Sequence, residues 1–480
     1  MLEETISVLL FNVFFIIIFI ISIISLLKRV NHIAILMTTI LWGIVPWPYY
    51  YLELNLESVL MITFIRVLIA SIFGFILIFS FILFNKVQKR NSLFEWFQFN
   101  YNDFKRNIKS ALPNHSTNLN YKSKKMHFYY IIYYFLLGFS YFFSILFYFL
   151  SYNFLGVIFS AIINTVGVTI IIAIYNMLRK YENLNSIKIS YLITLFIAGI
   201  LTIISAPLIF SAESTIFGVI SLILTIIFWF LFIIFSGIDD FTEYEKERIL
   251  SFKDKSTNFQ LVKSLIKVSF FFLFSLIILI LFVVIYPLFP IKNIYLTNDI
   301  NKFIEELQYI PYIFQNYWTW AIGVNCTIIP YLVYFQSQNN WPSRSLRWDQ
   351  WISILSVFEP MASIFIGLFI GDEINYDLFL LTIAMILMII VMLLRYYHEK
   401  HCIKSIIFMK IKPKKLERFL SRLKYNPHIC EIMVIAGEYD IVIKTYFPTF
   451  YTLKNFIDKL KQLECVIEVN HHIEFELKRK

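Results

Sequence analysis

The chain has 480 residues, of which 59% are hydrophobic, and its 42 Lys and Arg residues against 32 Asp and Glu residues give a net charge of +10. A mean hydropathy of +0.70 places most of the chain in the membrane class and excludes a simple series of soluble domains. The basic residues lie in short loops beside apolar runs, which is typical of membrane topology. We therefore expect a lipid bilayer as a partner, and no nucleic acid.

The first apolar run covers residues 9–27 and is followed by Lys28 and Arg29. Glutamates precede the run, whereas a cleaved signal peptide begins with basic residues. We therefore predict a retained leader helix in a segment 1–32, with the N-terminus outside the cell.

Ten more apolar runs each have about the 20 residues that a helix needs to cross a bilayer. They lie at 33–52, 58–84, 128–150, 154–177, 188–209, 214–236, 265–289, 315–336, 350–370 and 377–395. Five of these runs fall in residues 33–212 and five in residues 213–396. Because each half has an odd number of spans, the second half enters the membrane from the opposite side. This predicts an all-α polytopic domain, an inverted 5+5 repeat, with a solute site near the midplane.

The loops predict the orientation of these helices. Those on the side of Lys28 and Arg29 hold almost all of the loop Lys and Arg residues before residue 395, whereas the other side holds only Lys292 and Lys302. Basic loops stay in the cytoplasm. We therefore predict a multi-pass protein of the plasma membrane with a cytoplasmic C-terminal region.

Residues 85–127 form a long basic insertion that also contains several aromatic side chains. Such a segment favours an interfacial position, attracted to anionic lipid. A binding role for the insertion is the alternative.

Two candidate site residues lie in the first two core helices. Trp42, beside Gly43, either packs in an aromatic belt at the interface or lines a cavity. Arg66 lies about eight residues into its helix, or about 12 Å at 1.5 Å per residue. It either extends to the interface or lines a cavity, where it would pair with Glu359 or bind an anionic group of the solute.

The stretch Ser356–Glu373 contains the most informative pair, Glu359 and Pro360. A charge in mid-membrane costs roughly 2.5–3.5 kcal/mol, so Glu359 should face a cavity or a partner. Pro360 removes a backbone donor, so the helix is expected to kink or unwind there. In a faint internal symmetry, Asn164 of the fourth core helix occupies the position that corresponds to Glu359.

From residue 403 the apolar pattern alternates between strand and helix periods. Predicted strands begin near Ile406, Ile429, Ile441 and Ile467, and two helical stripes separate them. The order is βαββαβ, an α+β ferredoxin-like unit over residues 403–480, joined to the membrane part by a linker at 397–402.

Short motifs in the membrane part resemble the EamA branch of the drug/metabolite transporter superfamily. They are Leu41-Trp42-Gly43, Phe64-Ile65-Arg66, and Glu359-Pro360 followed by Gly371-Asp372-Glu373, within about 33–395. The resemblance implies alternating-access transport of a small solute, with Trp42, Arg66, Asn164, Glu359 and Pro360 as substrate-binding candidates. The chain departs from the family in its leader helix, in the 85–127 insertion, and in having Asn164-Thr165 where the first repeat often has proline.

The C-terminal unit resembles the Lrp/AsnC ligand-binding module, or RAM domain, through Gly437-Glu438-Tyr439-Asp440. The resemblance implies pairing of modules into a homo-oligomer and a small effector, commonly an amino acid, bound by Gly437, Tyr439 and Asp440. A purely structural alternative is a turn that needs glycine and an aspartate that caps it. No helix-turn-helix accompanies the module, which removes the transcription-factor interpretation.

The sequence contains no catalytic constellation. A phosphate-binding Walker loop, a nucleophile elbow and an HExxH motif are all missing, and the four cysteines lack paired zinc spacing. We therefore expect no enzyme, no cofactor, no metal site and no ATP-driven pumping. The sequence predicts a transporter of small metabolites with a cytoplasmic effector-sensing domain. The alternative is a membrane receptor or scaffold that does not transport and senses a small molecule through its C-terminal domain.

Overall fold

The computed structural model describes most of the chain in segments. These are residues 2–28, 31–89, 118–178, 186–205, 213–236, 256–288, 293–339, 352, 355–370, 377–400, 403–412, 416–423, 429–435, 437–447 and 450–473. Contacts divide it into two units, of which the first comprises Met1–Asn164, Leu208–Asn340 and Phe358–Asn375. The second comprises Thr165–Pro207, Trp341–Val357 and Tyr376–Lys480.

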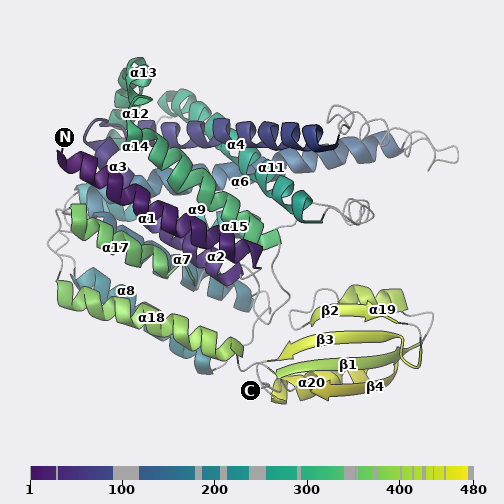
Figure 1. The fold of residues 1–480 in the computed structure, drawn as a ribbon. Coiled ribbons are helices and arrows are strands. Elements are labelled where there is room, and N and C mark those ends of the chain that lie inside the picture. Colours follow the sequence, from purple (N-terminus) through teal and green to yellow (C-terminus); the bar gives the residue numbers. More distant parts are fainter. Residues whose placement is uncertain are drawn as a thin grey trace. The chain divides into compact units, whose positions relative to one another are not determined.

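The regular elements of the first unit are all helices within its described part (Figure 1). An apolar run in lipid must form its backbone hydrogen bonds internally, and a helix does so. Its helices are α1 (Leu2–Leu27), α2 (Asn31–Gly43), α3 (Pro46–Glu53), α4 (Val59–Lys89), α6 (Asn118–Leu155), the start of α7 (Val157–Leu178), α9 (Glu213–Ser236), α11 (Ser256–Ile285), α12 (Ile294–Glu306), α13 (Ile310–Ile313), α14 (Tyr317–Trp320), η3 (Ala321–Ile328), α15 (Ile329–Asn339) and α17 (Phe358–Ile370). Short 3-10 turns, η1 (Tyr286–Leu288) and η2 (Leu307–Tyr309), flank α12.

Six segments of the described residues are long and apolar enough to cross a membrane. They are Glu4–Leu27, Asn31–Glu53, Val59–Ser80, Ile132–Leu155, Ser214–Ser236 and Ser264–Leu288. Four shorter apolar helices lie at Val157–Ile172, Leu192–Ser205, Phe358–Phe369 and Phe379–Val391. A helix overlaps each predicted range. The count of ten core spans nevertheless stays a prediction. Within the described residues, the shorter apolar helices do not reach the length that a helix needs to cross a bilayer.

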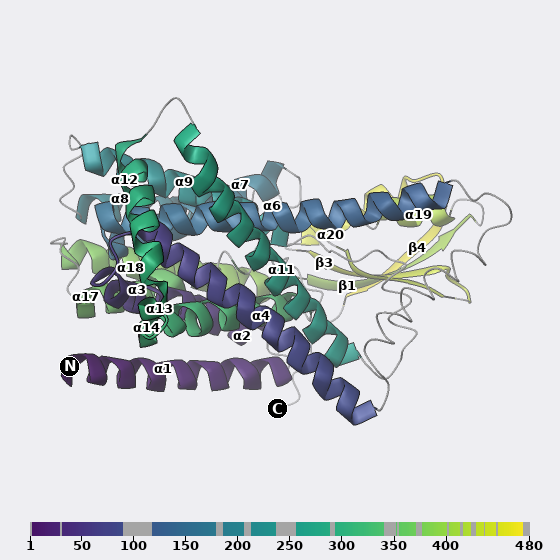
Figure 2. The ribbon, with the colours of Figure 1, turned by 90° about the horizontal axis from the view of Figure 1, so that it is seen from above.

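Helix α2 lies among several partners in the first unit, contacting α1, α15 and α17. Figure 2 shows α1 along the edge of these helices. Gly43 permits the closest of these contacts, because a Cβ added there would lie 2.3 Å from the backbone oxygen of Glu359. The glycine of the predicted Leu-Trp-Gly motif is therefore needed for the packing of α2 on α17.

The helix that carries Glu359 is interrupted, as its proline predicts. Ser356 and Val357 form a turn, and α17 begins at Phe358. Pro360 thus lies in the first turn, where its missing backbone donor costs no helical hydrogen bond. The break lies within the span predicted at 350–370, and Ile352 and Leu355 before it are also helical.

Two predicted boundaries also differ from the structure. Helices α4 and α6 extend into the predicted insertion as far as Lys89 and from Asn118 onward, and residues 90–117 lie outside the described part. The predicted linker at 397–402 is partly helical, because α18 (Leu378–Lys400) continues to Lys400.

The second unit contains a helix pair and a sheet domain. Helix α8 (Ser186–Ser205) packs along α18, and the backbone N–H of Asp377 donates to the carbonyl of Ser205 at 2.9 Å. The sheet domain consists of β1 (Ile403–Ile411), α19 (Leu416–Leu423), β2 (Ile429–Val434), β3 (Ile441–Phe447), α20 (Phe450–Lys461) and β4 (Val466–Ile473). This is the βαββαβ order expected from the sequence.

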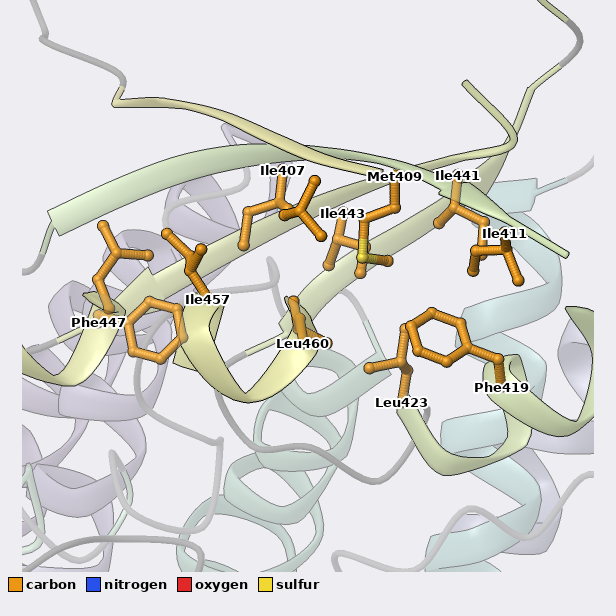
Figure 3. Packing of buried hydrophobic residues seen from close by; sticks show 12 residues of the cluster. Ile407, Met409, Ile411, Phe419, Leu423, Ile441, Ile443, Phe447, Ile457 and Leu460 are labelled. Atoms are coloured by element: carbon orange, nitrogen blue, oxygen red, sulfur yellow. The ribbon is translucent and has the colours of Figure 1, made fainter. Parts of the chain in front are cut away.

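The four strands form one antiparallel sheet in the order β2-β3-β1-β4. Alternate residues of the strands, such as Ile407, Met409 and Ile443, are fully buried against α19 and α20. Phe419 of α19 and Leu460 of α20 complete this core, which Figure 3 shows between the sheet and its two helices. The domain therefore has a hydrophobic core of its own.

Candidate functional site

The first unit contains a cavity within its helices. It is lined by Trp42 and Val45 near the end of α2, Arg66 of α4, Ser144, Ile145 and Tyr148 of α6, Asn164 of α7, Thr225 and Trp229 of α9, Tyr331 of α15 and Glu359 of α17. The space open to a water-sized sphere is about 20 Å³, enough for about one water molecule. The conformation described is therefore nearly closed around this cavity.

Arg66 contributes the positive charge of the cavity. Only 2% of its side chain is exposed, its Nε donates to Thr327 Oγ1 at 2.7 Å, and its Cζ lies 5.4 Å from the centre of the Phe149 ring. The interface alternative for Arg66 does not fit this burial.

The π-helix η3 positions the partner of Arg66. Thr327 donates in turn to the carbonyl of Ile322 at 2.6 Å, a spacing of five residues. Pro330 follows at the next turn, where it cannot donate to the carbonyl four residues earlier. Such π segments are frequent at functional sites, because the extra residue redirects side chains.

Glu359 contributes the negative charge. It is 5% exposed, and its Oε1 accepts a hydrogen bond from the hydroxyl of Tyr148 at 3.3 Å. The contact of Gly43 with the Glu359 backbone, together with the Ser363 hydroxyl donating to the Gly43 carbonyl at 3.1 Å, fixes the start of α17 against α2. The position of the carboxylate is thus set by packing of the two helices.

Two further lining residues carry polar atoms without partners. Nε1 of Trp42 and Oδ1 of Asn164 are buried and make no hydrogen bond. The Trp42 ring packs against two other rings, with centroid distances of 5.4 Å to Trp229 and 5.1 Å to Tyr331. Other buried atoms of the described residues, such as Trp318 Nε1, also lack a partner, but these two belong to residues that line the cavity and can hydrogen-bond a polar molecule there.

The two charges of the cavity do not pair directly. Among the residues described, no ion pair within 4.0 Å joins Arg66 to Glu359. An ionised group in apolar surroundings is costly unless it is paired, and within the described residues each of these side chains bonds to a hydroxyl group and not to an opposite charge. The cavity is therefore a polar site whose hydrogen-bonding capacity the protein does not fill.

Four of the five residues expected from the sequence thus meet around one cavity, namely Trp42, Arg66, Asn164 and Glu359. Pro360 is buried beside them but does not line the cavity. Their role in binding a substrate stays a prediction. Sequence analysis missed the tyrosines of the cavity, because a chain with 30 Tyr residues gives no reason to select two of them.

A second buried polar cluster lies where α12 meets the start of α4. The carboxylate of Asp299 accepts from the backbone N–H groups of Val59 at 2.7 Å and Leu60 at 3.1 Å. Glu306 Oε1 accepts likewise from Glu57 at 2.6 Å and Ser58 at 3.2 Å. These carboxylates satisfy N–H groups that a helix start leaves without internal partners.

Burial raises the pKa of Asp299 to about 6, and hydrogen bonds from the Val59 and Leu60 N–H groups oppose this shift. Burial also raises the pKa of Glu306. At the surface of the same cluster, Lys302 pairs with Glu57 at 2.8 Å, and this pair lowers the pKa of Glu57. We call this cluster the α12 junction. It consists of Asp299, Glu306, Lys302, Glu57 and the start of α4.

The turn between β2 and β3 holds the other predicted binding residues. Gly437 has φ +155°, a conformation that side chains disfavour, and Asp440 Oδ2 accepts from the N–H of Ile411 at 2.7 Å. The ring of Tyr439 lies 5.7 Å from that of Phe408 on the sheet face opposite the helices. Its hydroxyl accepts a hydrogen bond from Nδ2 of Asn470 on β4.

The comparison with protein families now identifies this domain. Residues 404–477 match the family model of the Lrp/AsnC ligand binding domain. The Lrp/AsnC domain is thus established by its own sequence match and is consistent with the strand order above. A search of curated proteins found no match to the chain. No match to the EamA family was found either, so that resemblance rests on the short motifs alone.

Within the Lrp/AsnC domain, Gly437 and Asp440 have structural roles that account for them. The turn requires the glycine, and the Asp440 carboxylate is occupied by a backbone N–H of β1. Tyr439 lies at the surface of the open sheet face and is only partly buried. A role of these residues in effector binding stays a prediction. No group of His, Cys, Asp and Glu suited to a metal ion occurs in the described segments.

Proposed function

We propose that this protein is a membrane transporter of small metabolites that works by alternating access and carries a cytoplasmic effector-sensing domain. The observation that carries the proposal is the cavity. It places Arg66 and Glu359 inside an apolar helical unit, unpaired with each other, beside unpartnered polar atoms of Trp42 and Asn164. Buried charges without direct partners are expensive in a membrane, and a solute that binds them accounts for their presence.

The small size of the cavity supports a cycle of conformations. With room for about one water molecule, the described state is too closed to hold a metabolite. In the proposed mechanism the cavity widens toward one side of the membrane at a time, and α17, interrupted before Glu359, moves relative to α2. Interrupted helices at solute sites are the usual arrangement in carriers built from inverted repeats.

The orientation belongs to the same proposal. The concentration of Lys and Arg in loops on one side favours a cytoplasmic location for the Lrp/AsnC domain and an outer location for the N-terminus. The EamA-like motifs favour a 5+5 inverted repeat. In this arrangement α12 and the α12 junction lie on the outer side.

The Lrp/AsnC domain supports a sensing role, since the family model describes a ligand binding domain. We propose that a small effector, such as an amino acid, binds this domain and that paired domains join subunits. An effector shifts the transporter between states only if it binds them with different affinity, and the coupling is then reciprocal.

Flux measurements on the purified full-length protein in liposomes test the transporter directly. A panel of labelled metabolites is offered to the wild type, to Glu359→Gln, and to the matched control Glu57→Gln, which changes an exposed glutamate outside the cavity. We expect flux of at least one solute in the wild type and the control, and none in Glu359→Gln. Equal flux in all three proteins would remove Glu359 from the mechanism.

A second candidate, a receptor or scaffold without transport, is favoured by one observation. The part of the chain that matches a family model, residues 404–477, is a ligand binding domain. Calorimetric titration of amino acids into residues 403–480, which have a core of their own, tests the sensing role. Binding there without flux in liposomes would support the receptor, and flux without binding would leave the domain a device for oligomerisation.

A further inference from the structure

From the charges and polar atoms of the cavity we infer that the solute is a zwitterion, a small molecule with one anionic and one cationic group. The inference rests on the proposed function and names the chemical class of the substrate. It starts from three features of the cavity: the sign of its charges, the type of its unpartnered atoms, and the nature of its walls.

The cavity contains one charge of each sign. Arg66 and Glu359 both line it, both are nearly fully buried, and no direct ion pair joins them within the described residues. A solute with a single charge would bind one of these groups and leave the other without a counter-charge in apolar surroundings. Leaving one buried charge without its counter-charge is strongly unfavourable. A zwitterion is the solute that compensates both.

Net charge leads to the same conclusion. The ionised pair of Arg66 and Glu359 is neutral overall, and a zwitterion keeps the loaded cavity neutral as well. Moving a net charge through a membrane is costly, whereas a neutral pair in contact with two opposite protein charges is not. The change between outward-facing and inward-facing states then moves no net charge, whether the cavity is empty or loaded.

The unpartnered atoms match this arrangement. Trp42 Nε1 is a donor, as is the guanidinium of Arg66, and Asn164 Oδ1 is an acceptor, as is the carboxylate of Glu359. Donors suit a carboxylate or another acidic group, and acceptors suit an ammonium group. The cavity therefore offers two donors and two acceptors to one solute.

The aromatic walls suit the cationic end and the carbon skeleton. Trp42, Trp229 and Tyr331 all line the cavity, and the ring of Trp42 packs against the other two. The face of an aromatic ring attracts a cation and contacts apolar groups. A zwitterion with a modest apolar skeleton uses all of these surfaces.

Three matched pools of probes test the inference on the full-length protein. The first pool contains proteinogenic amino acids with uncharged side chains, the second the amines that result from their decarboxylation, and the third the acids that result from their deamination. Flux is measured in proteoliposomes, and binding is measured as the rise in melting temperature of the purified protein. We expect flux and stabilisation with the first pool, at least about tenfold above either control pool, because charge-assisted hydrogen bonds are the strong ones.

Two variants sharpen the test. Both are compared by stabilisation, because Glu359→Gln is expected to lose flux. In this measurement Glu359→Gln should lose its preference for zwitterions over the deaminated acids, and Arg66→Gln should lose its preference over the amines. A higher flux with the amines or the acids in the wild type would overturn the zwitterion while leaving the transporter in place. Flux of only uncharged metabolites from a wider panel would likewise overturn the zwitterion and leave the transporter in place.

The failure of the proposed function gives a different result. Stabilisation by the first pool that Glu359→Gln and Arg66→Gln abolish, without flux of any solute, would retain a zwitterion site and refute transport. An absence of both stabilisation and flux with the first pool would refute the zwitterion.

Discussion

Two buried polar clusters of the helical part differ in how completely their hydrogen bonds are made. Among the described residues, Trp42 Nε1 and Asn164 Oδ1 of the cavity have no partner, and Arg66 and Glu359 bond to hydroxyl groups and not to each other. In the α12 junction, carboxylates of Asp299 and Glu306 meet backbone N–H groups at the start of α4, and Glu306 Oε2 alone of these four carboxylate oxygens lacks a partner within the described residues.

The difference distinguishes a binding site from a structural joint. A cluster that stabilises the fold pairs its polar groups, because an unmade buried hydrogen bond costs more than a made one returns. A cluster that binds a solute keeps groups available. Substitutions in the cavity should therefore affect transport more than stability, and substitutions in the junction should do the reverse.

The largest effect is expected for the charges of the cavity. Arg66→Ala and Glu359→Gln should each abolish flux while the melting temperature in detergent stays the same or rises, because each removes a charge that is costly to bury. Flux is measured in liposomes and melting by intrinsic fluorescence. A fall in melting temperature as large as that of a junction variant would place these residues among the structural ones.

Gly43 should show a large effect on both properties. A Cβ at this position lies 2.3 Å from the Glu359 backbone oxygen and 2.6 Å from the Ala362 Cβ, so Gly43→Ala must push α17 away from α2. We expect a loss of roughly 1–3 kcal/mol of stability from overpacking, together with loss of flux.

Gly199→Ala is the matched control for Gly43→Ala. The added Cβ there meets only the Cγ1 atom of Val166 at 3.3 Å, which a small movement relieves. Its flux and melting temperature should stay near the wild type. Wild-type flux in Gly43→Ala would show that the contact between α2 and α17 does not position Glu359.

Asp299 should show the opposite behaviour to the cavity. Asp299→Ala leaves the N–H groups of Val59 and Leu60 without their acceptor, which costs roughly 1–3 kcal/mol for a buried group. The melting temperature should fall by several degrees, and flux per folded molecule should stay within about twofold of the wild type. A complete loss of flux in protein that remains folded would connect the junction to transport.

The pH dependence of stability separates Asp299 from its neighbours. Its pKa is about 6 in the folded protein against 3.8 for an ordinary aspartate, so the folded state binds the proton more tightly. This contribution to stability is complete below about pH 4 and is lost as the pH rises through about 6. The melting temperature of the wild type should therefore decline from pH 4 to 7 relative to Asp299→Asn, which does not titrate. Glu306 titrates in both proteins, but its contribution cancels only in part, because the Asp299 charge raises the pKa of Glu306.

The sequence predicted the Lrp/AsnC domain almost completely, because strands with period two and helices with amphipathic stripes are local patterns. One exception is Ile467, for which the alternation of apolar and polar residues in the last strand predicts the buried face but which is 56% exposed. The register between β1 and β4 shifts at Lys410 and Ile411, and this irregularity turns Ile467 outward. A shift of this kind has no signal in the sequence of one strand.

The cavity was predictable only in its charges. Arg66 and Glu359 stand out in apolar runs, and Trp42 and Asn164 were reached through short motifs and a faint symmetry. Tyr148 and Tyr331 could not be selected among so many aromatic residues. The α12 junction was not predicted, because Asp299 and Val59 are 240 residues apart and nothing local connects them.

The smallest effect is expected at the surface of the junction. Lys302 and Glu57 form an ion pair at 2.8 Å, but their side chains are 45% and 74% exposed, so water and salt screen it. Lys302→Ala should change neither flux nor melting temperature measurably in 0.15 M salt, although Lys302 lies in the same helix as Asp299. The buried hydrogen bonds of Asp299 then account for the stability of the junction. A loss in Lys302→Ala as large as that in Asp299→Ala would instead assign this stability to the surface ion pair, and the contrast between the junction and the cavity would no longer rest on burial.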